Sequence, residues 1–212
     1  MSLQIDCAHA DAIAALMPFA SPAASRNAVP LAHALAPELP DKGVVLEVAS
    51  GSGFHAAVLA LHFPHITWQP TEADPARFPP MEDLVQEASL ENLKAPCMLD
   101  AAVLDWPVAD AEAILCLNMI HISPWVVAEG LMQGAGRILK KDGALFLYGP
   151  FTIDGVHTAP SNVMFDESLR DKNPDWGVRN SIDVDHAAGE NGLTFERFIE
   201  MPANNMIRIY RK

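Results

Sequence analysis

The sequence predicts an α/β protein with a Rossmann-like, doubly wound sheet of about seven strands, mostly parallel and ending in an antiparallel hairpin. Two observations support this prediction. Short aliphatic runs alternate with helix-like segments up to residue 150, and two strand-like runs flanking a turn end the chain. We expect residues 1–212 to form a single domain, with an N-terminal arm over 1–24 and a cover segment over 151–180.

The elements before residue 150 are expected to alternate. Residues 1–24 are rich in alanine and indicate a loose or partly helical arm, and Ser25 is a candidate cap for a helix over about 26–39. The β-branched and aliphatic residues 44–48 suit a buried parallel strand. The further expected elements are a helix over 54–63, a strand over 66–69, a helix over 75–91, strands over 96–99 and 113–117, a helix over 124–139 and a strand over 144–148. This alternation favours parallel strands joined by right-handed crossovers.

The pattern changes after Pro150. Residues 151–180 contain turn formers and few periodic apolar residues, and we expect this ordered stretch to cover the carboxyl ends of the strands. A helix over about 183–190 follows. Two strands, over 193–200 and 206–210, flank a turn and predict the hairpin.

Composition and charge narrow the function classes. Half of the residues are hydrophobic and 19% are charged, which is typical of a globular protein. The net charge is -13 and no run of Lys or Arg occurs, so we expect neither nucleic acid nor a membrane surface as a partner. The three cysteines are isolated, which favours reduced thiols and a cytoplasmic location. The histidines show no metal-ligand spacing, so no metal is expected.

The strongest motif is Glu47-Val48-Ala49-Ser50-Gly51-Ser52-Gly53, a turn between the first strand and a helix. Open α/β sheets bind ligands at such a strand end. Glycines at 51 and 53 let the backbone come close to a ligand, and the N–H groups of the next helix suit a carboxylate. We therefore expect cofactor contacts at Glu47, Ala49, Gly51 and Gly53, with a plain tight turn as the alternative.

The same turn contains Gly51-x-Gly53-x-x-Ala56, which also matches a dinucleotide fingerprint. An NAD(P)-dependent oxidoreductase is therefore an alternative. Glu47 counts against it, because a carboxylate repels nucleotide phosphates, and so does the helix expected before the first strand. A cationic cofactor with a sulfonium, such as S-adenosylmethionine, is compatible with the acidic chain.

Two further acids follow strand ends. Glu72 lies 25 positions beyond Glu47 and is suited to accept hydrogen bonds from both hydroxyls of a ribose, with Asp74 as a substitute. Asp100, after the third strand, is suited to the exocyclic amine of adenine. A solvated loop acid or a helix cap is the alternative at each position. Together these acids favour S-adenosylmethionine as the cofactor.

Catalytic candidates follow the fourth and fifth strands. His121, in Asn118-Met119-Ile120-His121, is a candidate general base because the reference pKa of histidine lies near 6.5. A packed, structural histidine is the alternative. Tyr148, at the end of the fifth strand, either orients an acceptor or packs in the core.

Many separated motifs resemble one family over nearly the whole chain. They are Ser21-Pro22-Ala23-Ala24 with Arg26-Asn27, Leu46 to Gly53 with His55-Ala56, Trp68-Gln69-Pro70, Asn118 to Ile122 with Pro124-Trp125, Tyr148 to Phe151, Ser161-Asn162, Phe165-Asp166, Leu169-Arg170, Asn173-Pro174 with Trp176-Gly177, and Met201 to Asn205. This pattern resembles the methyltransferase-like family known as domain of unknown function 938.

The resemblance implies a class I methyltransferase-like fold and S-adenosylmethionine as cofactor, with cofactor contacts extended to Arg26, Asn27 and Asn118. This chain has Thr71-Glu72 where Ser-Asp is common and Phe54 where Gln is common. Glu72 keeps the ribose carboxylate, whereas Phe54 puts a polar role at that position in doubt.

These observations predict an S-adenosylmethionine-dependent methyltransferase with a small-molecule acceptor. A non-catalytic cofactor-binding or partner-binding protein is the second interpretation, and an NAD(P)-dependent oxidoreductase is the third. The acceptor and the oligomeric state stay open. The candidate acceptor-pocket residues are Arg26, Asn27, Asn118, His121, Tyr148, Asn162, Arg179 and Asn204.

Overall fold

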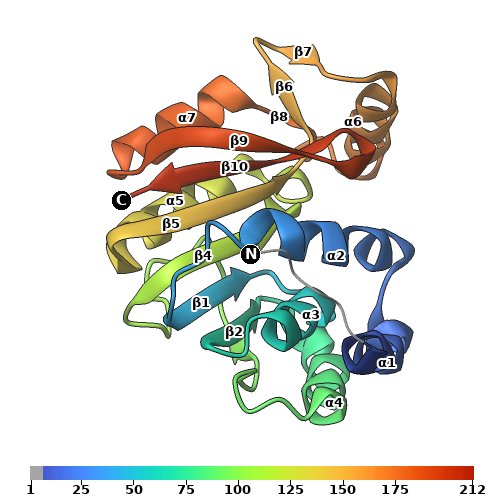
Figure 1. Ribbon diagram of the computed structural model, residues 1–212. Helices are drawn as coiled ribbons and strands as arrows, with labels where there is room; N and C mark the ends of the chain where they lie inside the picture. The colour runs from blue at the N-terminus through green and yellow to red at the C-terminus, as the bar shows by residue number, and fades with distance from the viewer. Residues whose placement is uncertain (1–6) are drawn as a thin grey trace. The chain divides into compact units, whose positions relative to one another are not determined.

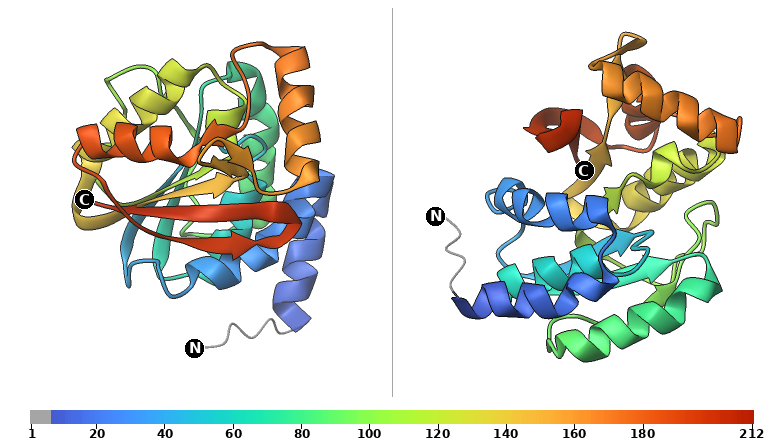
Figure 2. Two further views of the ribbon diagram at one scale, coloured as in Figure 1. Left: turned by 90° about the horizontal axis from the view of Figure 1, so that it is seen from above. Right: turned by 90° about the vertical axis from the view of Figure 1, so that its right-hand side faces the viewer.

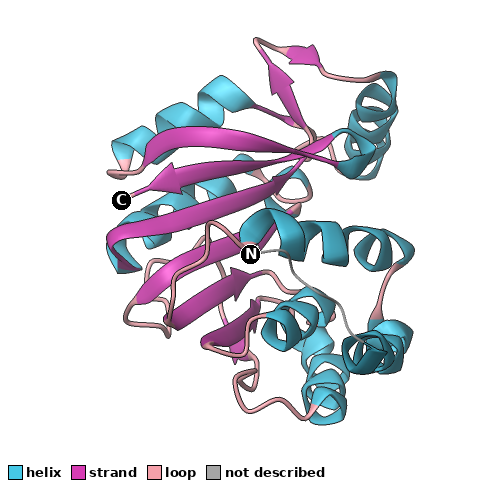
Figure 3. Ribbon diagram, viewed as in Figure 1, coloured by secondary structure: helices cyan, strands magenta, loops and turns pink. Residues whose placement is uncertain are grey.

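Strands and helices alternate along residues 7–212, the part of the chain that the computed structural model describes (Figure 3). They group into two units, one ending at Leu99 and one running from Asp100 to Lys212 (Figure 1). Residues 1–6 of the expected arm lie outside the described residues. The single-domain organisation stays a prediction.

Three parallel strands form the sheet of the first unit, in the order β3-β2-β1. They are β1 (Gly43–Val48), β2 (Ile66–Glu72) and β3 (Cys97–Met98). β2 is longer than expected and continues through Pro70 to Glu72. A proline has no N–H to donate, but the next residue, Thr71, donates its N–H to Ser50 Oγ at 3.1 Å, so the strand extends to Glu72.

The helices of the first unit are α1 (Cys7–Leu16), η1 (Met17–Phe19), α2 (Pro22–Leu35), α3 (Phe54–His62), η2 (Pro75–Arg77) and α4 (Phe78–Ala88). The expected start of α2 after Ser25 is wrong. Ser21 is the cap, because its Oγ accepts the N–H of Ala24 at 3.1 Å and Pro22 fits the first helical position. α3 packs on α2 and β2, and its apolar side chains are almost all buried.

The sheet of the second unit has the order β4-β5-β10-β9. Its strands are β4 (Ala111–Leu117), β5 (Leu139–Gly149), β9 (Thr194–Met201) and β10 (Asn205–Arg211). β4 and β5 are parallel, whereas β10 is antiparallel to both β5 and β9. The short helix η4 (Pro202–Asn204) connects β9 to β10. Counted over both units, these seven strands, mostly parallel and closed by a terminal hairpin, confirm the predicted fold class.

Residues 151–180, the expected cover segment, contain regular secondary structure. They contain α6 (Pro160–Lys172) and the small sheet β7-β6-β8, built from β6 (Phe151–Ile153), β7 (Val156–His157) and β8 (Arg179–Asn180). α6 packs beside β7 (Figure 2). The sequence indicated no helix or strand in these residues, and their role as a cover stays a prediction. α6 buries only Asn162 and Leu169, so its sequence lacks the apolar periodicity of a core helix.

The remaining helices of the second unit are η3 (Met119–His121), α5 (Trp125–Ile138) and α7 (Ser181–Glu190). α7 packs against α5 and β9. Between α7 and the sheet lies an ion pair in which Nη2 of the buried Arg208 donates to both carboxylate oxygens of the half-buried Asp185, at 2.5 and 2.6 Å. The hydroxyl of Tyr210 also donates to Asp185, at 2.7 Å. Within residues 7–212, no helix has the length and apolar character required to cross a membrane.

Candidate functional site

The turn after β1 holds its backbone in the left-handed region at Ala49, Gly51 and Gly53, with φ values of 58°, 63° and 78°. An alanine in this region is strained, and such strain often accompanies function. The two glycines differ in their surroundings. A Cβ on Gly53 would lie 2.7 Å from Cγ of Met81, whereas a Cβ on Gly51 would have Nη1 of Arg77 as its nearest neighbour, at 4.0 Å. Within the first unit, Gly51 therefore borders open space and Gly53 is packed against α4.

Glu72 is held beside this turn. Its Oε2 accepts the N–H of Gly51 at 3.0 Å, and its Oε1 accepts the N–H groups of Ala73 and Asp74 at 2.9 and 3.3 Å. These bonds fix the orientation of the carboxylate and leave lone pairs for further donors. Asp74 instead caps η2 through the N–H of Ala76. The structure thus brings Glu72, and not Asp74, to Gly51.

Glu47 presents a different kind of carboxyl group. Its side chain is 1% exposed, and Oε2 has no hydrogen-bond partner among the described residues. Burial raises the pKa of Glu47 to about 7. A buried carboxylate oxygen without a partner is costly, and a cation placed against Oε2 would remove that cost. The first unit therefore fits a ligand that carries positive charge and hydroxyl donors.

Arg26 and Asn27 lie on α2. The side chain of Arg26 is exposed, whereas Oδ1 of Asn27 lies 2.7 Å from Nε2 of His55 on α3. Burial lowers the pKa of His55 to about 4, so this ring is neutral at physiological pH. The hydrogen bond ties Asn27 to the helix that follows the glycine turn.

In the second unit, Asn118 and Tyr148 lie together at the ends of β4 and β5. The N–H of Asn118 donates to the carbonyl of Tyr148 at 2.8 Å, and Asn118 has a φ of 61°. Asp100 is exposed, and its Oδ1 accepts the N–H of Ala102 at 2.9 Å. The functional roles of these residues stay predictions.

His121 is completely buried. Its Nδ1 accepts the backbone N–H of Arg179 at 3.3 Å. Its ring packs edge-on against the ring of Phe151, with the two ring centroids 5.1 Å apart. Since Nδ1 is an acceptor, the proton of the neutral ring is on Nε2, which has no partner among the described residues. Burial, together with the charge of Arg179, lowers the pKa of His121 to about 3. The hydrogen bond from Arg179 therefore connects His121, after the end of β4, to β8. The catalytic role of His121 stays a prediction.

Arg179 reinforces this junction. Its Nε donates to the carbonyl of Ile120 at 2.8 Å, and its Nη2 donates to those of Ser123 and Asp175 at 2.6 and 2.8 Å. Its Cζ lies 5.7 Å from the ring centroid of Trp125. The expected acceptor residue Arg179 thus fixes the loop that follows β4.

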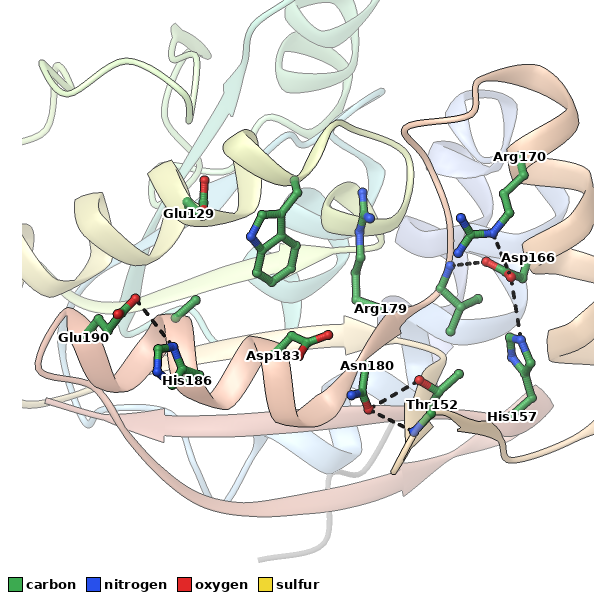
Figure 4. A pocket seen from close by; sticks show the side chains of 14 residues that line it. Glu129, Thr152, His157, Asp166, Arg170, Arg179, Asn180, Asp183, His186 and Glu190 are labelled. Atoms are coloured by element: carbon green, nitrogen blue, oxygen red, sulfur yellow. Dashed lines mark hydrogen bonds and ion pairs between the residues drawn. The ribbon is translucent and has the colours of Figure 1, made fainter.

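Sequence reasoning missed a cavity of about 710 Å³ in the second unit, between α5, α7 and the small sheet (Figure 4). At one end Asp166 accepts hydrogen bonds from the N–H of Val178 at 2.7 Å and Nε of Arg170 at 3.0 Å. Although burial opposes it, these bonds hold the pKa of Asp166 below its usual value. Nε2 of His157 lies 3.6 Å from the same carboxylate. Phe165-Asp166 and Leu169-Arg170 were recognised as motifs, but their joint position on one helix was not.

Two other expected acceptor residues meet near the hairpin turn. Nδ2 of Asn162 donates to the carbonyl of Asn204 at 3.0 Å, and Nδ2 of Asn204 donates to Oγ of Ser161 at 2.9 Å. Asn204 also lines a smaller cavity, of about 390 Å³. Across the described part of the chain, no group of three or more His, Cys, Asp or Glu side chains is arranged to hold a metal ion.

Residues 17–212 match the family described as protein of unknown function (DUF938). The fold is similar to an O-methyltransferase family protein from Burkholderia thailandensis, with 16% identity and a TM-score of 0.76, covering 100% of this chain and 64% of that one. It is also similar to a methyltransferase of calicheamicin biosynthesis in its SAH-bound form, with 15% identity and a TM-score of 0.71. The match covers 89% of this chain and 54% of that one.

A third similar structure is a putative sarcosine dimethylglycine methyltransferase from Galdieria sulphuraria, with 17% identity and a TM-score of 0.70. The match covers 88% of this chain and 85% of that one. The chain therefore spans little more than half of the calicheamicin enzyme and 64% of the Burkholderia protein. At these identities the likeness shows the fold.

Proposed function

The chain belongs to the DUF938 family, and we propose that it is an S-adenosylmethionine-dependent methyltransferase with a small-molecule acceptor. The observation that carries this proposal is the buried carboxyl of Glu47, which has an unpartnered oxygen and lies directly before the glycine turn. The methionine part of S-adenosylmethionine carries an ammonium and a sulfonium. A cation of this kind is the partner that Oε2 of Glu47 lacks.

The neighbouring groups support the same ligand. Glu72 is oriented by three backbone N–H groups, so its free lone pairs are suited to two ribose hydroxyls. The open space beside Gly51 allows close approach of the backbone. We propose further cofactor contacts, from sequence reasoning, at Arg26, Asn27, Ala49, Gly53, Asp100 and Asn118.

When bound, the cofactor supplies an already activated methyl group, so the protein mainly has to align the acceptor and exclude water. We propose Tyr148 and His121 for the acceptor side. Since Nδ1 of His121 accepts the N–H of Arg179, the geometry favours a positioning role over proton abstraction. An acceptor that must lose a proton on methylation would release it to water.

Calorimetry with four ligands tests the proposal. S-adenosylmethionine and S-adenosylhomocysteine should both bind, and NAD and NADP should not. A Gly51→Val variant that stays folded should lose this binding, because its side chain fills the open space. Tight binding of NAD or NADP without a response to either adenosyl ligand would overturn the proposal. Formation of S-adenosylhomocysteine with a panel of small acceptors then separates an enzyme from a protein that only binds the cofactor.

A further inference from the structure

One face of α5 lacks side chains where the segment after Asp100 lies against it. Gly130 and Gly134 are four residues apart and so share this face. A Cβ on Gly130 would lie 2.2 Å from the carbonyl oxygen of Ala101, and a Cβ on Gly134 would lie 2.1 Å from Cζ2 of Trp106. No side chain fits at these distances, so both glycines are required for residues 101–106 to reach the helix backbone.

Trp106 is held against α5 by packing. Its side chain is buried, and its indole Nε1 has no hydrogen-bond partner in the described part of the chain. A buried indole without an acceptor is unfavourable unless close packing offsets the cost. The ring edge over Gly134 is the contact that supplies this packing.

Asp100 directly precedes this anchored segment. Its Oδ1 accepts the N–H of Ala102 at 2.9 Å, and its carbonyl accepts the N–H of Val103 at 3.1 Å. Because the same turn contains Ala101, whose carbonyl lies over Gly130, the Asp100 carboxylate has a position set by α5.

We propose that Gly130, Gly134 and Trp106 are positioning residues that set the selectivity of the cofactor site for adenine. They act by fixing the carboxylate of Asp100 where it accepts a hydrogen bond from the exocyclic amine. This inference rests on the proposed function, because it takes Asp100 to read the adenine of S-adenosylmethionine. The packing against α5 explains how Asp100, an exposed acid on a surface turn, can select for adenine.

Two ligands isolate the contact: S-adenosylhomocysteine and its inosine counterpart, in which an oxygen replaces the exocyclic amine. The wild-type protein should bind the adenosyl ligand about 10- to 150-fold more tightly, the range for a hydrogen bond to a charged group. Asp100→Asn should remove most of this preference. Gly134→Ala should reduce it to a few-fold, because the new methyl group displaces Trp106 and with it the turn.

Gly136→Ala is the matched control. A Cβ at Gly136 would lie 2.2 Å from the carbonyl oxygen of Asn191, so the steric conflict is of the same size but lies away from the Asp100 turn. This variant should lose stability and keep the preference for the adenosyl ligand. Trp106→Phe is the milder second probe, since it shortens the ring without adding a clash, and it should also lower the preference.

The outcomes distinguish a failure of the positioning inference from a failure of the proposed function. If folded Gly134→Ala or Trp106→Phe protein keeps the full preference while Asp100→Asn loses it, the positioning inference is wrong. It is equally wrong if Gly136→Ala loses the preference as much as Gly134→Ala, or if Asp100→Asn keeps it. If the wild-type protein binds neither S-adenosylhomocysteine nor its inosine counterpart, the proposed function itself fails.

Discussion

Replacing Glu47 by glutamine should stabilise the free protein and weaken its binding of S-adenosylmethionine. Burial raises the pKa of Glu47 to about 7, from 4.5 in the unfolded chain. Below pH 4.5 the carboxyl is neutral in both states, and its contribution to stability is fully present. As the pH rises to about 7, the unfolded chain ionises first and that contribution is lost. The difference of about 2.5 pKa units corresponds to about 3 kcal/mol at 1.36 kcal/mol per unit.

Glutamine does not titrate, so the Glu47→Gln variant should be more stable than the wild type at pH 8, by up to about 3 kcal/mol, and similar to it near pH 4.5. Urea unfolding at a series of pH values measures this difference. The wild type should also bind S-adenosylmethionine more tightly as the pH rises from 6 to 8, because the cation favours the ionised carboxylate. Calorimetry in two buffers of different ionisation enthalpy should show proton release on binding, and the variant should show none.

Two results would refute this reasoning. The first is a glutamine variant that is no more stable than the wild type at pH 8. The second is a variant that binds S-adenosylmethionine as tightly as the wild type, because Glu47 would then be a buried acid without a ligand. Glu47→Ala is a less suitable test, since it also creates a cavity.

Four further changes test other parts of the structure. Gly51→Val should abolish cofactor binding in calorimetry with a modest loss of stability; normal binding would mean that the turn is only structural. Glu72→Ala should weaken the cofactor by roughly 1.5–3 kcal/mol and Asp74→Ala should not, and the reverse order would misplace the ribose contact. The lowered pKa of His121 contributes stability above pH 6.5, and this contribution is lost as the pH falls from 6.5 to about 3. His121→Asn should therefore lose less free energy of unfolding than the wild type over that range. An equal dependence of the free energy of unfolding on pH in the two proteins would contradict the low pKa. Asp185→Ala should cost about 3–5 kcal/mol in urea unfolding by leaving a buried guanidinium unpaired, whereas a cost below 1 kcal/mol would show that water reaches it.

The sequence predicted the parallel region well because its strands are short, fully buried and separated by glycine and proline signals. β1 and the glycine turn illustrate this, since the apolar run ends where the backbone enters the left-handed region. The end of β2 was harder, because Pro70 normally argues against a strand and the Ser50 hydroxyl that receives the next N–H is remote in sequence.

The helix and the short strands of residues 151–180 were also not predicted, for a related reason. α6 buries few apolar residues, and its place depends on hydrogen bonds such as that between Asn162 and Asn204, 42 residues apart. The large cavity of the second unit collects residues from six elements, α5, β6, β7, α6, β8 and α7, which no local pattern can show. For the proposed cofactor residues, the motif located the glycines and acids, but only the structure distinguished the surroundings of Glu72 from those of Asp74 and the surroundings of Gly51 from those of Gly53.

Gly149 is fixed by two independent constraints, one from its neighbours and one from its own backbone. A Cβ at Gly149 would lie 2.4 Å from Nε2 of His121, so no other residue fits at 149 while the imidazole is present. A smaller residue at 121 would remove this clash, but the φ of 156° at Gly149 would still strain any other residue there. A library that varies both positions should therefore recover glycine at 149 whatever the side chain at 121.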